Sequence, residues 1–210
     1  MLELWLWRHP RPCGVAGRCI GQTDVVVHWR RAKRLAHRVR EQARRHQLPH
    51  VVWTSPLQRC AAVGHWLARW GWLHHIETDL LELDFGSWDG QPWANIPHSA
   101  VAAWEADFLQ HAPGGGEALV ALLARCQAFI NARAAQPGPA VLLVVAHAGW
   151  INACAVLGQA ASQQAAGDQT MFTASTWPAA PRYGSLSVRP VSQQARTVHT
   201  PHLGARATHT

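Results

Sequence analysis

Charged and titratable side chains follow four apolar stretches of this 210-residue chain, each at the point where a strand is expected to end. Arg8 and His9 follow the first apolar stretch, and Arg59 comes shortly after the second. Glu82 follows the third stretch and His147 follows the fourth. Core packing gives no reason to place ionisable groups repeatedly at strand ends, so these five residues are candidates for one shared site.

The chemistry that suits this set is phosphoryl transfer. A phosphate monoester is a dianion, and the planar, always-charged guanidinium of arginine matches its oxygens. A neutral imidazole can attack phosphorus and form a phosphohistidine, and a carboxylic acid can protonate the leaving oxygen and later deprotonate water. Where two arginines and a second histidine bear the charge, no metal or other cofactor is required. Each residue alone has a plainer reading, as a structural histidine, a surface ion-pair partner or a loop acid.

The first half of the chain supplies two strands and two helices that would position these residues. Residues 2–7 and 51–53 are short apolar runs typical of buried strands. Residues 29–46 have a helical period, with Leu35 and Val39 facing inward and arginines facing outward. The sequence 55–58 (SPLQ) has the form of a capping box, with Ser55 as the N-cap, and predicts a helix that runs to about residue 70.

The second half continues the alternation of strand and helix. A third strand is predicted at 76–80 and a fourth, the strongest strand signal, at 140–146 (AVLLVVA). Helices are predicted at 99–109, 117–135 and 150–157. This order predicts a three-layer α/β/α sandwich with a mostly parallel central sheet, whose ligands bind beyond the carboxyl ends of the strands.

Composition bounds the class of protein. Hydrophobic residues make up 48% of the chain and charged residues 15%, which excludes a disordered or fibrous chain. We expect one catalytic domain over residues 1–190 and a polar, flexible tail over 191–210. No apolar run reaches the roughly 18–20 residues of a membrane span, and the first residues lack the basic start of a signal peptide, so a cytoplasmic protein without a membrane partner is expected.

The net charge of +7 does not by itself indicate a nucleic-acid partner. Much of the excess lies between residues 30 and 45, and the plainer reading is a solvated helix face. No zinc-finger spacing, heptad or aromatic-interleaved basic sheet accompanies it, so a small anionic substrate is the expected partner. The 5 cysteines have no CxxC and the 14 histidines no HExxH, so no metal site is predicted. The sequence does not indicate an oligomeric state.

Four motifs resemble those of the histidine phosphatase superfamily, the phosphoglycerate-mutase-like proteins. Residues 6–9 (LWRH) resemble its RHG motif, and residues 55–59 (SPLQR) resemble its SxLxR motif. Residues 82–90 (ELDFGSWDG) are similar to its ExDFGxWEG segment, and 145–149 (VAHAG) to its VxHxG motif. The four occur in the family's order over residues 1 to about 160.

The resemblance implies a phosphoglycerate-mutase-like fold and a role for each candidate residue. His9 would be the phosphorylated nucleophile and Glu82 the general acid and base. Arg8, Arg59 and His147 would hold the phosphoryl group, and no cofactor or metal would take part. Asp84 and Asp89 lie close to Glu82 in sequence, and either could share its role.

Other features look like the α-ribazole phosphatases of cobalamin biosynthesis. These are Pro10 after the histidine, the stretches 17–24 (GRCIGQTD) and 113–117 (PGGGE), and the region around Trp177 and Tyr183. Pro10 stands where most members of the superfamily have glycine, which removes a backbone N–H donor beside the nucleophile.

The resemblance therefore predicts a phosphoric monoester hydrolase, with α-ribazole 5′-phosphate as the expected substrate. The alternatives are a phosphoglycerate-mutase-type phosphotransferase, a broad-specificity phosphatase for sugar or nucleoside phosphates, and a non-catalytic module that binds phosphorylated ligands. Only 65 positions separate Glu82 from His147, whereas mutases usually carry extra sequence there. The presence of all five key residues counts against the binding module.

Overall fold

The computed structural model describes residues 2–136, 140–164 and 172–191. The described part contains five strands and five α-helices, joined in places by single turns of 3₁₀ helix. In chain order they are β1 (Leu2–Arg8), α1 (Trp29–Arg45), β2 (Val51–Thr54), α2 (Gln58–Ala68), β3 (Leu73–Ile76), α3 (His98–Ala106), α4 (Leu119–Ala134), β4 (Val141–Ala146), α5 (Ala148–Gln164) and β5 (Leu186–Val191).

The strands form one mixed sheet in the order β3-β2-β4-β1-β5. The pairs β1–β4, β2–β4 and β2–β3 are parallel, and β5 lies antiparallel to β1 at one edge. Parallel neighbours need crossover connections, which α1, α2 and the long stretch ending in α4 supply. The predicted α/β sandwich with a mostly parallel sheet is confirmed.

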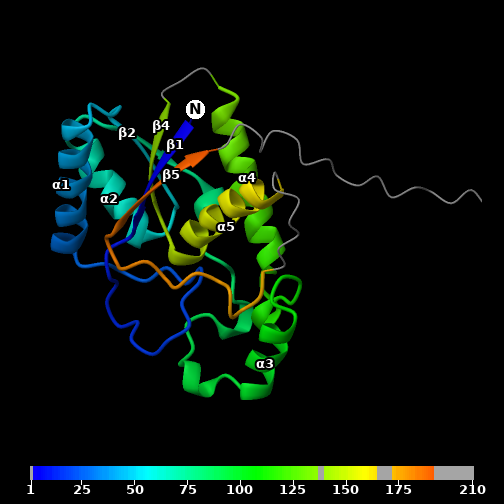
Figure 1. Ribbon diagram of the computed structural model, residues 1–210. Coiled ribbons are helices and arrows are strands. Elements are labelled where there is room, and N and C mark those ends of the chain that lie inside the picture. The colour runs from blue at the N-terminus through cyan, green and yellow to red at the C-terminus, as the bar shows by residue number, and fades with distance from the viewer. Residues whose placement is uncertain (1, 137–139, 165–171, 192–210) are drawn as a thin grey trace, which may run out of the picture.

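Helices cover both faces of the sheet (Figure 1). The side chains of β1 alternate between these two faces and are buried on both. Trp5 and Trp7 pack among the buried residues of α1 and α2, while Leu4 and Leu6 pack among those of α4 and α5. Burial of each such side chain contributes roughly 1.5–3 kcal/mol to stability. In Figure 1, α3 stands apart at one end of the sandwich.

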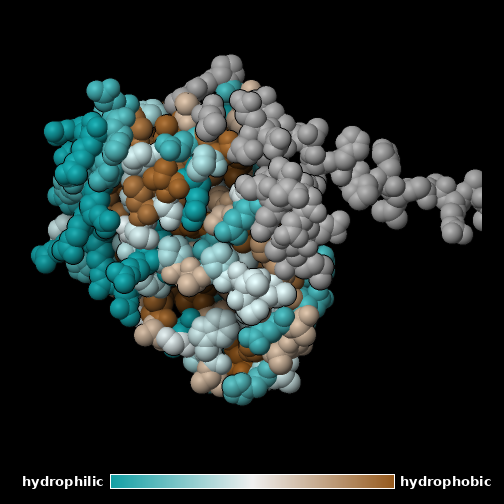
Figure 2. Space-filling model, viewed as in Figure 1, coloured by the Kyte–Doolittle hydropathy of each residue, from teal (hydrophilic) through white to brown (hydrophobic). Residues whose placement is uncertain are grey.

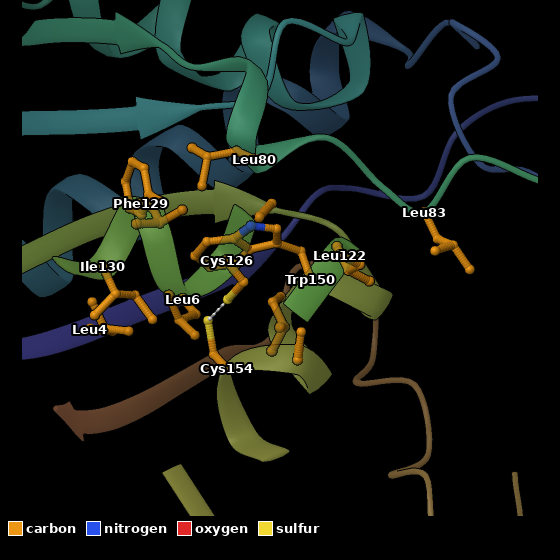
Figure 3. Packing of buried hydrophobic residues seen from close by; sticks show 14 of the residues in the cluster. Leu4, Leu6, Leu80, Leu83, Leu122, Cys126, Phe129, Ile130, Trp150 and Cys154 are labelled. Carbon is orange, nitrogen blue, oxygen red and sulfur yellow. Dashed lines mark hydrogen bonds between the residues drawn. The ribbon is translucent and has the colours of Figure 1, made fainter. Parts of the chain in front are cut away.

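The packing of α4 against α5 brings two thiols together in the core. Figure 3 shows the side chains of Cys126 and Cys154 pointing toward each other beside Trp150. Their sulfur atoms lie 3.2 Å apart, and both thiols are free. Burial raises the pKa of the Cys154 thiol well above its usual value, so this thiol is un-ionised near neutral pH.

Helix α1 follows its sequence pattern closely. Its buried residues include Leu35 and Val39, as predicted, and its arginines face outward. Figure 2 shows a continuous hydrophilic surface over this helix. No helix in the described ranges is both long enough and apolar enough to cross a membrane.

The predicted third strand at 76–80 was wrong by several residues. β3 covers Leu73–Ile76, and residues 78–80 form a 3₁₀ turn that buries Leu80. The short strand β2 offers four pairing positions, and Leu73–Ile76 fills them in register. His75 stacks on Trp53 with ring centroids 4.1 Å apart, so a histidine that reads as polar occupies a packed position.

The predicted capping box at the start of α2 was also wrong. The helix begins at Gln58, its N-cap residue is Leu57, and Ser55 makes no capping hydrogen bond. The Gln58 N–H donates instead to Oδ1 of Asp24, at 2.7 Å, which satisfies a free donor of the first turn from a distant loop.

Strand β5 was not predicted from the sequence. It pairs with β1 along all but the last residue of that strand, from Leu2 opposite Val191 to Trp7 opposite Leu186. Val191, the first residue of the predicted tail, is therefore part of the sheet. Residues 192–210 lie outside the described residues.

Candidate active site

The register of the parallel strands collects the predicted site residues at one edge of the sheet. Arg8 lies opposite Ala146 on β4, and Thr54 at the end of β2 lies opposite Val145. The next residues along these strands, His9, Ser55 and His147, therefore meet just beyond the sheet. The ring centroids of His9 and His147 are 5.1 Å apart.

His9 is buried, with 5% of its surface exposed, and its ring is fixed by its own chain. Nδ1 lies 2.9 Å from the carbonyl oxygen of Pro10, which can only accept a hydrogen bond. Nδ1 must therefore carry the hydrogen, and Nε2 has the free lone pair. Burial, together with the positive charges of Arg59 and Arg8, lowers the pKa of His9 to about 3, so the ring is neutral at pH 7.

His147 is fully buried between two partners. Nε of Arg59 donates to its Nδ1 at 3.2 Å, which leaves the hydrogen on Nε2. Nε2 lies 2.7 Å from the hydroxyl oxygen of Ser55 and donates to it. Burial and the charge of Arg59 hold the pKa of His147 well below its usual value, so this ring is also neutral.

Arg59 extends from the first turn of α2 and is 1% exposed. Besides its bond to His147, it donates from Nη1 to the carbonyl oxygen of Thr23 at 2.8 Å and from Nη2 to that of Gly21. A guanidinium has five N–H groups, so one on each terminal nitrogen is left for a ligand. The orientation of Arg59 is therefore set by the loop at residues 21–23.

Arg8 is anchored by the segment before β5. Its Nη1 donates to the carbonyl oxygen of Pro181 at 2.6 Å, and its guanidinium carbon lies 3.9 Å from the centre of the Tyr183 ring. The Tyr183 ring is also 5.5 Å from that of His9. Burial lowers the pKa of Arg8, while the nearby Tyr183 and Glu82 raise it.

Glu82 is buried and held by backbone amides. Oε2 accepts from the N–H of Gly149, and Oε1 accepts from the N–H of Leu83, both at 3.1 Å. Gly149 lies directly against the carboxylate, since a Cβ atom at that position would be 2.3 Å from Oε1. Glu82 therefore lies beside the start of α5, at Gly149, which follows His147 by two residues.

The two neighbouring carboxylates have different surroundings. Asp84 accepts from the N–H of Gly86 at 2.8 Å and so closes a turn. Asp89 accepts from the backbone N–H groups of the 21–23 loop. Of the three acids, only Glu82 lines the pocket described next.

A pocket of about 530 Å³ opens beside Arg8 and Glu82, within the usual range for small-molecule sites. His9, Arg59 and His147 do not line it. Six of its lining side chains are aromatic: Phe85, Trp93, Trp104, Phe108, Trp177 and Tyr183. Arg18 and Glu105 add charged groups to its wall.

Sequence reasoning missed Arg125, which holds the segment that carries Glu82. From α4, its Nη1 donates to the carbonyl oxygens of Asp79 and Leu81, and its Nη2 donates to that of Glu82 at 3.0 Å. It also forms an ion pair with Glu117 at 2.8 Å. An arginine on a mostly apolar helix gives no sign of such contacts in the sequence. No group of three or more histidines, cysteines, aspartates or glutamates that could hold a metal lies within the described ranges.

The model of the histidine phosphatase superfamily (branch 1) matches residues 4–176, which is most of the chain. The chain belongs to this superfamily. A search of curated protein sequences finds no significant match.

Solved structures of phosphatases share the fold of this superfamily member. Mycobacterial glucosyl-3-phosphoglycerate phosphatase has 26% sequence identity and a TM-score of 0.64, over 75% of this chain and 79% of that one. A structure of the same phosphatase with VO3 has 27% identity, also with a TM-score of 0.64, over 75% of this chain and 82% of that one. The α-ribazole phosphatase from Shigella flexneri has 23% identity and a TM-score of 0.67, over 92% of both chains, and at that identity shows the fold alone. Family and neighbours together establish a phosphatase.

Proposed function

We propose that this phosphatase hydrolyses a phosphate monoester through a phosphohistidine on His9, and that its substrate is α-ribazole 5′-phosphate. One observation carries the mechanism. The hydrogen bond from Nδ1 to the Pro10 carbonyl leaves the lone pair of a neutral His9 on Nε2, next to two guanidinium groups. This is the protonation state that a nitrogen nucleophile needs.

In the first step, Nε2 of His9 attacks phosphorus and the bond to the ester oxygen breaks. Arg8 and Arg59 neutralise the charge on the phosphoryl oxygens, and His147 keeps Arg59 oriented toward them through Nδ1. Glu82 donates a proton to the leaving oxygen, which departs as an alcohol. The Pro10 carbonyl accepts from Nδ1–H throughout, and so stabilises the positive charge that develops on the ring.

In the second step, water attacks the phosphohistidine. Glu82, now a carboxylate, takes the proton from water as the P–N bond breaks. His9 returns to its neutral form, because burial lowers its pKa to about 3 and disfavours the imidazolium. Inorganic phosphate is the second product.

The pocket supports the choice of substrate. Its aromatic side chains form a connected series, from Phe85 to Trp104 at 5.9 Å, then to Phe108 at 5.3 Å and Trp177 at 5.8 Å between ring centroids. Flat aromatic ligands stack favourably on such surfaces. α-Ribazole carries a benzimidazole ring, and the stretches 17–24 and 113–117 resemble the phosphatases that act on its phosphate.

A second substrate class is favoured by Arg18. This side chain lines the pocket. Within the described part of the chain, its guanidinium forms one hydrogen bond, from Nη1 to the Gly90 carbonyl at 2.8 Å, which leaves most of its N–H groups for a ligand. A guanidinium in this place suits a leaving group with a carboxylate, as in glucosyl-3-phosphoglycerate.

The test is a panel of esters assayed with EDTA present: α-ribazole 5′-phosphate, glucosyl-3-phosphoglycerate, nucleoside monophosphates and p-nitrophenyl phosphate. We expect the highest kcat/KM for α-ribazole 5′-phosphate. A tenfold or greater preference for glucosyl-3-phosphoglycerate that disappears in Arg18→Gln would establish the second class instead.

The mechanism is tested separately by trapping the intermediate. Rapid quenching with labelled substrate should give protein-bound phosphate that is stable to base and labile to acid. His9→Ala should abolish both this label and turnover, whereas His98→Ala, at an exposed position in α3, should change neither. Normal turnover in His9→Ala would refute the phosphohistidine.

A further inference from the structure

We infer that Asp89 is a positioning residue for phosphoryl binding, which acts through the 21–23 loop to orient Arg59. This inference rests on the proposed role of Arg59 at the phosphoryl group. Asp89 itself lines no part of the pocket, and we assign it no contact with substrate.

The Asp89 carboxylate binds three successive backbone N–H groups. Oδ1 accepts from Gly21 at 2.9 Å, and Oδ2 accepts from Gln22 at 2.6 Å and from Thr23 at 2.8 Å. Both oxygens are therefore used, and the path of the loop is fixed on its amide side. Charged acceptors form the stronger class of hydrogen bond, so this carboxylate is the main determinant of that path.

The same loop presents its carbonyl groups to Arg59. The carbonyl oxygens of Gly21 and Thr23 accept from the two terminal nitrogens of the guanidinium. Because each peptide unit is planar, a change in where its N–H points also changes where the neighbouring C=O points. The Gly21 carbonyl shares its peptide unit with the Gln22 N–H, so Asp89 sets the direction of that acceptor. The Thr23 carbonyl belongs to the following peptide unit, and Asp89 influences it by holding the N–H of Thr23 itself.

Tight packing keeps the loop from adapting by a rigid shift. A Cβ atom at Gly21 would lie 2.3 Å from the carbonyl oxygen of Leu83 and 2.8 Å from the Phe85 ring. The Gln22 side chain also donates to the carbonyl oxygen of Glu82 at 3.1 Å. The loop is therefore held against the segment that carries both the acid and Asp89.

Asp89→Asn removes this arrangement with little change in size. An amide has one acceptor oxygen and one NH₂ group, so whichever way it is turned, at least one loop N–H faces a donor. The loop must move, and the two carbonyl acceptors of Arg59 must move with it.

The experiment measures the Kd of orthovanadate by isothermal titration calorimetry, which does not depend on turnover. Loss of hydrogen bonds to a charged group predicts a rise in Kd of roughly 10- to 100-fold for Asp89→Asn. Asp107→Asn removes the same charge from an exposed position at the end of α3 and should leave the Kd unchanged. Asp89→Glu, which keeps the charge and both acceptor oxygens, should bind more tightly than Asp89→Asn.

A double-mutant cycle with Arg59→Gln separates positioning from general stability. If Asp89 acts through Arg59, then Asp89→Asn should raise the Kd by less than about twofold in the Arg59→Gln background. Asp89→Glu serves the same cycle should the asparagine variant not fold. An equal rise in both backgrounds, or an unchanged Kd in Asp89→Asn alone, would overturn the inference. Failure of the unmutated chain to bind vanadate would refute the phosphoryl site as well.

Discussion

Gly149 offers a way to displace the Glu82 carboxylate without altering Glu82 itself. An alanine at 149 would place its Cβ atom 2.3 Å from Oε1 and 3.2 Å from Cδ of Glu82. The carboxylate must leave this position, and with it goes the hydrogen bond from the Gly149 N–H to Oε2. Because the displaced atoms form the end of a flexible side chain, we expect little loss of folding stability. In addition, replacing glycine by alanine in a helix stabilises the folded state by up to about 1 kcal/mol.

The expected effect on activity is large and depends on the leaving group. General acid catalysis contributes roughly 10²–10⁴-fold to rate, which corresponds to about 2.7–5.4 kcal/mol of transition-state stabilisation. Gly149→Ala should lose most of this factor in kcat for esters of aliphatic alcohols, whose oxygen must be protonated as it leaves. The loss should be much smaller for p-nitrophenyl phosphate, because p-nitrophenolate leaves without a proton.

The matched control lies in the same helix. Gly158→Ala makes the same substitution in α5, where an added Cβ atom would meet no atom within 4 Å apart from its own helix backbone, and kcat should not change. In a Glu82→Gln background, Gly149→Ala should add little further loss, since the group that it displaces has already lost its proton-transfer role. Equal slowing of both ester types by Gly149→Ala would refute Glu82 as the proton donor.

Three further results are expected. The free energy of unfolding should fall as pH is lowered below about 6.5, by about 1.4 kcal/mol per pH unit for each buried neutral histidine. The reason is that His9 and His147 take up protons in the unfolded chain at a higher pH than in the folded protein, where their pKa values are lowered. Denaturant titrations at pH 7, 6 and 5 measure this slope, and its absence would show that both rings are already protonated in the folded protein. Arg125→Gln should lower kcat and melting temperature together, because three hydrogen bonds to carbonyl groups of the segment carrying Glu82 are lost. Arg133→Gln, which breaks the half-buried ion pair with Glu77, should lower only the melting temperature. Activity should survive EDTA and be inhibited by vanadate, because two guanidinium groups supply the positive charge, and loss in EDTA with recovery on adding Mg²⁺ or Zn²⁺ would contradict this.

Much of the fold could be predicted because its signals are local. The continuous apolar run at 140–146 and the one-sided pattern of α1 each specify an element from neighbouring residues alone. Parallel strands then place their carboxyl ends at one edge, so the meeting of His9 with His147 follows from topology. The predicted position of β3 was wrong because His74 and His75 are polar residue types, which do not indicate a strand, although both pack against neighbouring side chains.

The contacts that orient the site could not be predicted, because they join distant segments through backbone atoms. Asp24 accepts from the Gln58 N–H at the start of α2 from 34 positions away, and the Pro181 carbonyl accepts from the Arg8 guanidinium across 173 positions. Any residue type offers a carbonyl or an N–H group, so periodicity and composition carry no trace of such bonds. Ser55 illustrates the difficulty: its local sequence fits an N-cap, yet its hydroxyl binds His147 at the end of the neighbouring strand.

Burial gives the site its electrostatic character. Removing side chains from water penalises the charged form of every group, but histidine loses its proton easily, whereas arginine stays protonated in proteins. At one edge of the sheet, the same burial therefore leaves His9 and His147 neutral beside two guanidinium groups. A doubly negative phosphoryl group is matched by the two fixed positive charges, and a nitrogen lone pair remains available to attack it. An exposed histidine, with an ordinary pKa near 6.5, would be partly protonated at neutral pH and would lose part of that nucleophilicity.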